Sequence, residues 1–269
     1  METQPHSQSD LRLISYTPTT RRTSSASTEF AVPIPTVSEV WQTVPSAPAV
    51  VQPRPRMELA SRVLNVAIAG TALVALSPLM LITAVLVKAT SRGPIFYRQT
   101  RVGVDRRRPK GDLSFYDRRT RDLGGRVFAI YKFRSMTADA ERASGAVWAT
   151  KSDPRVTPLG RILRKSRIDE LPQLFNVIRG DMNIVGPRPE RPSIFANLRK
   201  DIAEYPLRQL AMPGITGWAQ INHSYDTSIE DVKTKVRFDL EYLQRQGVVE
   251  DLKIMLCTVP VMLFRRGGW

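Results

Sequence analysis

Two adjacent carboxylates, Asp169 and Glu170, stand out because they interrupt a strongly basic neighbourhood. They follow a run of arginines and precede an apolar segment that begins at Leu171. A carboxylate can attack phosphorus as a nucleophile, and a neighbouring carboxylate can bind a divalent cation. The same pair is also common where a helix begins, with Asp as the cap and Glu in the first turn. The pair alone is therefore compatible either with a catalytic role or with an ordinary helix start.

A helix is expected directly after the pair, because apolar residues recur at helical spacing from Leu171 to Ile178 and Gly180 is a natural stop. Pro172 is tolerated only in a first turn, so Asp169 is expected at or beside the N-cap. The free N–H groups and the dipole of a helix N-terminus favour negative charge. Both carboxylates are therefore predicted to stay ionised at neutral pH.

Three cations are candidates for holding a phosphate near the pair. The segment 127–136, "VFAIYKFRSM", alternates like a strand and places Lys132 and Arg134 on one face at its end. Such a pair suits a phosphate, although a solvated strand end has the same pattern. In "GPRP", residues 186–189, Pro187 and its neighbours stiffen the chain around Arg188. This motif is either an ordinary turn or a rigid mount for a bidentate phosphate binder.

The segment from Val63 to Val87 carries no charged residue and is longer than the roughly 20 residues that a membrane-spanning helix needs. A buried core helix is the alternative. Pro78, next to Ser77, should kink or break the helix. Arginines precede the segment, and a lysine and further arginines follow it. Under the positive-inside rule, both of its ends therefore look cytoplasmic. We therefore favour a helix–break–helix that enters one leaflet and returns, with Ser77 meeting a freed carbonyl, over a single crossing.

The net charge of +15 points to a polyanionic partner. Most of this charge lies between Arg54 and Arg134, much of it in the Arg-rich segment 105–126, which resembles a footprint for anionic lipid. Nucleic acid is the rival partner, but no recognised nucleic-acid-binding motif accompanies the charge. A single cysteine, Cys257, excludes an internal disulfide and favours a reducing compartment, and two histidines exclude the usual Cys/His zinc site.

The two ends of the chain differ in character. Residues 1–53 are rich in Ser, Thr, Pro and Gln and are predicted to be disordered. Apolar residues from Ile229 to Leu243 lie along one helical face, and a second apolar pattern runs from Leu252 to Phe264 before two arginines. Packing on the core explains both patterns, and the last segment could also lie at a bilayer interface.

Motifs for other chemistries are missing from the sequence: it contains no G-x-x-x-x-G-K-[ST], G-x-G-x-x-G, G-x-S-x-G or H-E-x-x-H. The D-x-D pattern with which many nucleotide-sugar enzymes bind their metal is absent too. Adjacent carboxylates, many arginines and a membrane segment then indicate phosphoryl transfer at a bilayer surface.

Several motifs together resemble one family. In order they are the Ser-Pro within the membrane segment, "GPIFYRQTRVG", "YKFRSM", "DPRVTPLGRILRKSRIDELPQLFNVIRGDM", "VGPRPE", "PGITGWAQIN" and "DLEYL…DLKIML". This series closely resembles the bacterial sugar transferases, the small monotopic phosphoglycosyl transferases, over about residues 57 to 264.

The resemblance implies an enzyme of the bacterial inner membrane that faces the cytoplasm and moves a sugar 1-phosphate, with glucose or galactose as the sugar, from a UDP-sugar to undecaprenyl phosphate. It implies that Asp169 forms a covalent phosphosugar intermediate, that Glu170 binds Mg²⁺, and that Arg164 and Arg188 bind substrate. Two-step ping-pong kinetics should follow. Possible partners are membrane lipid and polysaccharide-assembly proteins, with no nucleic acid. A membrane-anchored basic adaptor without catalysis is the alternative function.

The chain departs from the family after "WAQIN", where many relatives carry Gly-Arg and this chain has His223 followed by Ser and Tyr. His223 either replaces the missing arginine or is a plain surface residue. The expected fold is α/β (α+β): a small, mostly helical cytosolic domain with a short sheet, anchored by an N-terminal re-entrant membrane helix broken at Ser77-Pro78. The expected divisions are a tail (1–53), the membrane helix (54–90) and the catalytic domain (91–269).

Overall fold

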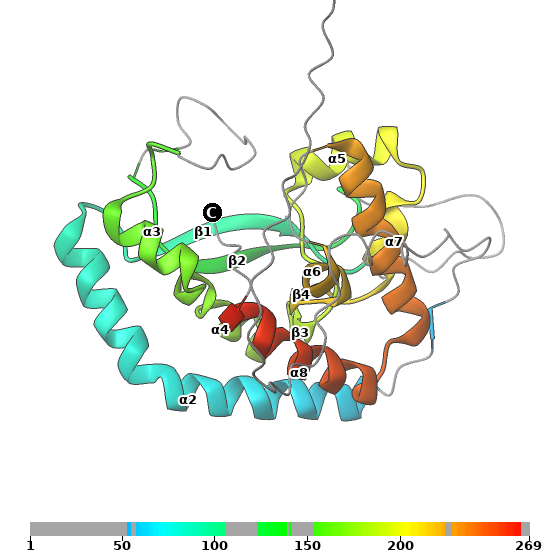
Figure 1. Ribbon diagram of the computed structural model, residues 1–269, viewed down its shortest axis with the longest axis horizontal. Helices are drawn as coiled ribbons and strands as arrows, with labels where there is room; N and C mark the ends of the chain where they lie inside the picture. Colours follow the sequence, from blue (N-terminus) through cyan, green and yellow to red (C-terminus); the bar gives the residue numbers. More distant parts are fainter. Residues whose placement is uncertain are drawn as a thin grey trace, which may run out of the picture.

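A computed structural model describes most of the chain beyond the tail. The described residues are 53–54, 58–105, 123–138, 140, 153–223 and 228–264, without the side chains of 262–264. The predicted disordered tail and most of the Arg-rich segment 105–126 lie outside them. The described part is mostly helical, with two small two-stranded sheets, which confirms the expected composition of the fold (Figure 1).

The longest element is the apolar helix α2 (Glu58–Thr90), the one helix of the described residues that is long and apolar enough to cross a membrane. Large apolar side chains on it, such as Leu81 and Val85, are exposed. The expected break at Ser77-Pro78 is wrong, because α2 bends along its length but continues as one helix through Pro78 (Figure 1). Pro78 lacks the N–H that would bond the Val74 carbonyl, and the Ser77 hydroxyl donates to that carbonyl at 2.8 Å instead. The expected role of Ser77 is confirmed.

Both ends of α2 are bonded to the rest of the fold. Near its N-terminus, the Arg62 guanidinium donates to the Val177 and Ile178 carbonyls. On the next turn the Asn65 side-chain oxygen accepts from the Ile184 amide at 2.6 Å, and Asn65 is fully buried. Near the C-terminus of α2, Arg134 donates to the carbonyls of residues 87, 91 and 94. One domain therefore binds both ends of the same apolar helix.

A β-hairpin follows the helix. Strand β1 (Phe96–Val102) pairs antiparallel with β2 (Val127–Phe133), in a register that sets Tyr97 opposite Lys132. The alternation read from the sequence is thus confirmed as a strand.

Two short helices then lie along α2. In α3 (Pro158–Lys165), Leu163 packs with Val87 of α2, and in α4 (Gln173–Arg179), Leu174 and Val177 pack with Ala69 of α2. Between them, a single 3-10 turn (Ile168–Glu170) carries the two carboxylates. The 3-10 turn with the two carboxylates thus lies between two helices that both pack against α2.

A second small sheet fixes the next turn of the chain. Strand β3 (Asn183–Val185) pairs parallel with β4 (Gly214–Thr216), and between them lie α5 (Pro192–Asp201) and a 3-10 helix (Tyr205–Leu210). Gly186 and Gly214 pass so closely that a Cβ on Gly186 would lie 2.1 Å from the Met212 carbonyl oxygen. Only glycine allows this approach, so the turn after β3 is locked against β4.

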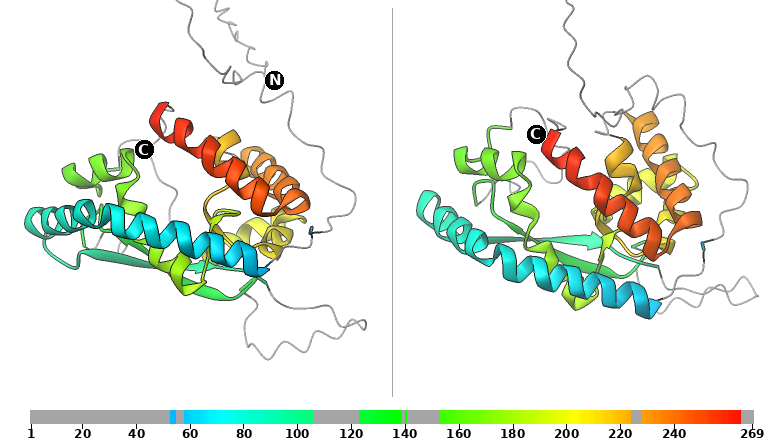
Figure 2. Two further views of the ribbon diagram at one scale, coloured as in Figure 1. Left: turned by 90° about the horizontal axis from the view of Figure 1, so that it is seen from below. Right: turned by 60° about the horizontal axis from the view of Figure 1, so that its bottom comes forward.

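The C-terminal helices close the main core. After α6 (Trp218–Asn222), α7 (Ile229–Arg245) begins with a capping box formed by Ser228 and Asp231, and α8 (Val248–Phe264) follows. The apolar face predicted for 229–243 is largely confirmed, because Val232, Val236, Leu240 and Leu243 are buried. The exception is Ile229 in the first turn, which is 45% exposed. Figure 2 shows α8 beside α2.

Candidate active site

The two carboxylates lie in a tight turn of their own. The N-cap prediction was wrong: α4 begins at Gln173 with Pro172 as its cap, and Asp169 and Glu170 belong to the preceding 3-10 turn. The reason is local, because Arg167 adopts a left-handed conformation with φ of 58° and turns the chain between α3 and the 3-10 turn. A non-glycine residue in this conformation is strained, and such strain often marks functional sites.

Glu170 is held by two cations from separate elements. Its Oε1 atom lies 2.8 Å from Nζ of Lys132 on β2 and 2.5 Å from Nη2 of Arg188, and its Oε2 atom lies 3.3 Å from Nη1 of Arg188. Burial opposes ionisation of Glu170, but Arg188 and Lys132 outweigh it and hold the pKa of this carboxyl well below its usual range. Glu170 is therefore a fixed anion in a bidentate pair.

Asp169 is buried as deeply but is not tied down in the same way. It is 5% exposed, and among the described residues its Oδ1 atom has no hydrogen-bond partner. Burial, together with the negative charge of Glu170, raises its pKa to about 6. The predicted ionisation at neutral pH still holds for most molecules, but the expected lowering of the pKa by a helix N-terminus does not apply, because α4 begins later, at Gln173.

The two carboxylates therefore have different chemistry. Glu170 is neutralised and oriented by Arg188 and Lys132, whereas Asp169 presents a buried, poorly solvated oxygen that none of the described residues bonds. A carboxylate that has lost its hydration is a stronger nucleophile, and an unpaired buried oxygen is a free position for a ligand. This difference is the main chemical feature of the site.

The structure places the other predicted residues in different surroundings. Arg164 on α3 is half-buried. Its positive charge lies near Asp169 and partly offsets the rise in the pKa of this carboxylate. Pro187 is buried beside Arg188 and its carbonyl accepts from the Gly214 amide at 3.0 Å. Arg134 is 5% exposed, and its guanidinium binds the end of α2, including the Ser91 hydroxyl at 2.7 Å. Its predicted contact with substrate stays a prediction.

Sequence reasoning missed two arginines of this region. Arg101 on β1 donates to the Pro189 carbonyl at 3.0 Å and pairs with Glu190 at 3.3 Å. Arg208 is 1% exposed and donates to the Arg188 carbonyl at 3.0 Å. In the sequence, Arg101 is marked only by its place two residues after Gln99 in an alternating strand, which is a weak indication of a site residue. Arg208 has no signal in its own segment, because its contacts come from distant residues.

The two carboxylates are the candidate ligands for a divalent cation. The described residues contain no cluster of three or more His, Cys, Asp or Glu side chains that could hold a metal by themselves. Mg²⁺, however, is commonly bound by one or two carboxylates together with substrate phosphates. Asp169 and Glu170 supply oxygen ligands of this kind, and no residue that the structure describes bonds Oδ1 of Asp169. The residues thus fit a cation that arrives with a phosphorylated substrate.

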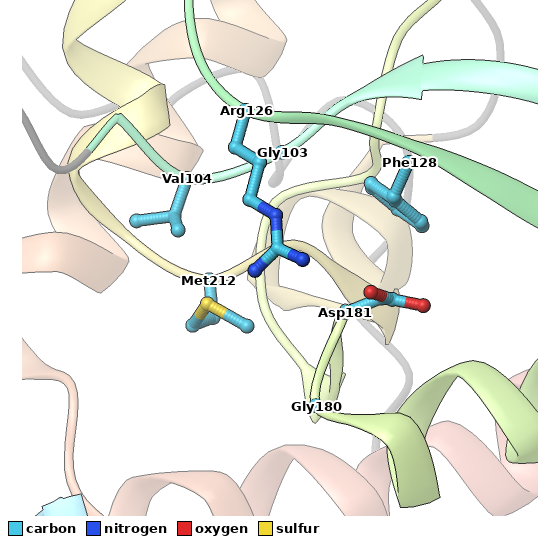
Figure 3. Close-up of a pocket in the computed structure, with 7 residues that line it drawn as sticks. All are labelled: Gly103, Val104, Arg126, Phe128, Gly180, Asp181 and Met212. Carbon is cyan, nitrogen blue, oxygen red and sulfur yellow. The ribbon is translucent and has the colours of Figure 1, made fainter.

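A small pocket lies elsewhere, between the end of the hairpin and the end of α4 (Figure 3). The side chains of Arg126, Met212 and Asp181 surround it. Its accessible volume of about 10 Å³ is no more than one water molecule needs. None of the residues that line it belongs to the carboxylate site, so we assign the chemistry to the carboxylates and not to this pocket.

The fold and the site together define a membrane-associated protein with an acidic centre surrounded by cations, suited to phosphorylated substrates. Comparison with known proteins agrees: the chain belongs to the bacterial sugar transferase family, which it matches over residues 56–265. The resemblance seen in the sequence is confirmed.

Three relatives illustrate the range of the family. The chain is 38% identical over 211 residues to a UDP-N-acetylgalactosamine-undecaprenyl-phosphate N-acetylgalactosaminephosphotransferase of Aeromonas hydrophila, covering 78% of this chain and 45% of the relative. It is 38% identical over 213 residues to a UDP-glucose:undecaprenyl-phosphate glucose-1-phosphate transferase of Caulobacter vibrioides, covering 78% and 72%. It is 37% identical over 230 residues to the exopolysaccharide production protein ExoY of Sinorhizobium fredii, covering 80% and 91%. The chain thus spans less than half of the first relative, and the relatives' names specify different sugars.

Proposed function

We propose that the protein transfers a sugar 1-phosphate from a UDP-sugar to undecaprenyl phosphate, as the first step of exopolysaccharide or other surface-glycan synthesis. The observation that carries the proposal is the Oδ1 atom of Asp169, which has no partner in the described part of the chain, beside a Glu170 held by Lys132 and Arg188. The names of the relatives, which specify undecaprenyl-phosphate sugar phosphotransferases, support the same substrate classes.

In the proposed mechanism Asp169 is the nucleophile. Its carboxylate oxygen attacks the phosphorus attached to the sugar, the bond from that phosphorus to the bridging oxygen breaks, and UMP leaves with the electron pair. An oxygen of undecaprenyl phosphate then attacks the same phosphorus, and the bond to Asp169 breaks. The products are a polyprenyl-diphosphate sugar and a free carboxylate. Splitting one displacement into two lets a single site serve both substrates in turn.

The surrounding residues prepare Asp169 for this role. Lys132 and Arg188 fix Glu170, and Arg164 adds positive charge that favours the approach of a diphosphate. Glu170, with oxygens of the donor diphosphate, would hold Mg²⁺, as the donor set allows. When bound, this ion would neutralise part of the negative charge of the diphosphate.

We also propose that α2 is re-entrant at the inner membrane, with the catalytic domain on the cytoplasmic side. Arg62 and Asn65 bond the first part of α2 to the domain that Arg134 bonds to its last part. A helix that crossed the bilayer once would hold its two ends on opposite sides, out of reach of a single domain. The bend and the Ser77–Val74 hydrogen bond support a helix that enters and returns.

A direct test uses purified protein, Mg²⁺, undecaprenyl phosphate and a panel of UDP-sugars. UMP release with one of these donors, and its loss in Asp169→Asn, is the expected result. Asp201→Asn is the matched control, because Asp201 is exposed at the end of α5. Label from the sugar phosphate should remain on the wild-type chain and be absent from Asp169→Asn. No release with any sugar would instead favour the alternative of a non-catalytic, lipid-binding adaptor.

The topology is tested by labelling introduced cysteines near residues 50 and 110 in intact cells, after replacement of the exposed Cys257 by Ser. The re-entrant arrangement predicts that both positions react from the cytoplasmic side. Reaction from opposite sides would establish a single crossing.

A further inference from the structure

The turn that carries Arg188 is bonded along its whole length. Residues 186–190 follow β3, and each carbonyl from Pro187 to Glu190 accepts a hydrogen bond from another part of the fold. The donors, in chain order of the acceptors, are the Gly214 amide, the Arg208 guanidinium, the Arg101 guanidinium and the Val102 amide. A turn held at four successive carbonyls fixes the direction in which the Arg188 side chain leaves it.

Arg208 is the more deeply buried of the two arginine donors. Its Nη2 atom lies 2.7 Å from Oδ2 of Asp239 on α7 and 3.0 Å from the Arg188 carbonyl oxygen. Its Nη1 atom donates to the Tyr205 hydroxyl at 2.9 Å. Arg208 is 1% exposed and Asp239 is 2% exposed. The Arg208 guanidinium thus joins α7 to the backbone of the turn that carries Arg188.

Stability alone does not explain a charged pair at this depth. Removing two charges from water costs about as much as their attraction returns, and apolar residues of similar size are often equally stabilising. An apolar pair, however, cannot donate a hydrogen bond to the Arg188 carbonyl. The geometry therefore points to a role in holding that carbonyl.

We propose that Arg208, fixed by Asp239, is a positioning residue that sets Arg188 in its bidentate pair with Glu170. The inference rests on the proposed function for its catalytic consequence, because Glu170 and Arg188 act there at the diphosphate. Arg208 itself touches the backbone of Arg188 and not the reacting atoms.

The first test replaces the pair together, as Arg208→Met with Asp239→Leu, so that no buried charge is left alone. The control removes an exposed pair from α7, as Lys233→Gln with Glu230→Gln. Hydrogen exchange is measured on the peptides that contain Val102 and Gly214, whose amides bond the same turn. Exchange should become at least several-fold faster there in the core variant and stay unchanged in the control. Exchange equal to wild type would overturn the proposal, whether or not the protein is an enzyme.

The second test is a double-mutant cycle on the rate of UMP release. A misplaced Arg188 should lower the rate on the order of 10- to 100-fold. In an Arg188→Ala background, the Arg208/Asp239 replacement should lower it less than about twofold further, since Arg208 acts through Arg188. A purely structural role would give multiplying losses and refute the inference.

A single substitution, Arg208→Lys, covers the case in which the double variant does not fold. One ammonium group keeps the charge beside Asp239 but lacks the guanidinium fork that also reaches the Arg188 carbonyl. It should therefore show the same faster exchange at Val102 and Gly214, and unchanged exchange would overturn the proposal. A wild type inactive with every donor refutes the proposed function, while the exchange result still decides the role of Arg208.

Discussion

The burial of Asp169 predicts that this residue destabilises the folded protein at neutral pH. Its pKa is about 6 when folded, against 3.8 for an ordinary aspartate, so the folded state binds a proton more tightly than the unfolded state. Stability should therefore fall as pH rises from about 3.8 to 6 and stay lower above that range. The difference corresponds to about 3 kcal/mol.

Asp169→Asn removes this penalty while keeping the side chain's size. Because Oδ1 has no partner among the described residues, the substitution sacrifices no hydrogen bond at that atom. At about 2 to 4 °C per kcal/mol for a chain of this size, the melting temperature at pH 8 should rise by roughly 6 to 12 °C. The inactive variant should thus be the more stable protein, a trade-off expected where function requires a strained charge.

The assay is thermal unfolding of wild type and variant from pH 4 to 8 in one detergent. The gap in melting temperature should be largest at pH 7 to 8 and shrink toward pH 4. Asp153→Asn is an informative contrast, because Arg155 lowers the pKa of Asp153 to about 2, so this change should destabilise. An Asp169→Asn protein that melts at or below wild type at pH 8 would refute the reasoning about burial.

Further predictions concern rate and packing. UMP release should fall about tenfold per pH unit below about pH 6, as Asp169 is protonated, and a rate that is flat down to pH 5 would contradict this. Lys132→Met should lower the rate at least tenfold, with Lys132→Arg recovering part of it, because the Oε1 atom of Glu170 loses one partner. Gly160→Ala should sharply reduce the yield of folded protein, since its Cβ would lie 1.9 Å from a backbone oxygen, whereas Gly70→Ala, with open space around it, should match or exceed wild type in melting temperature.

Periodic and local features were predictable from the sequence. Strand β2 followed from alternation, α2 from its uncharged length, and the hydroxyl of Ser77 from the carbonyl that Pro78 leaves free. The rigidity of the turn that carries Arg188 was predictable from its proline and glycine neighbours. These features depend on residues close together in the chain, where spacing carries the information.

The features that sequence reasoning missed depend on burial and distant contacts. The Asp169 pKa is set by loss of water in the folded protein, which no local pattern encodes. Arg208 acquires its partners from Asp239 and Arg188, far away in the chain. The start of α4 was misplaced because the left-handed Arg167 gives the carboxylates a turn of their own, and β-carbon-bearing residues in that conformation leave little trace in composition.

The bonds at both ends of α2 have a consequence for anyone seeking a water-soluble form of this protein. Cutting the chain after Thr90 would strip the Val177 and Ile178 carbonyls and the Ile184 amide of their partners and leave the Arg134 guanidinium without the carbonyl of residue 87. Each orphaned buried group costs about 1 to 3 kcal/mol, which together rivals the whole stability of a domain. Solubility is better sought by making the exposed apolar side chains of the helix polar while keeping its backbone in place.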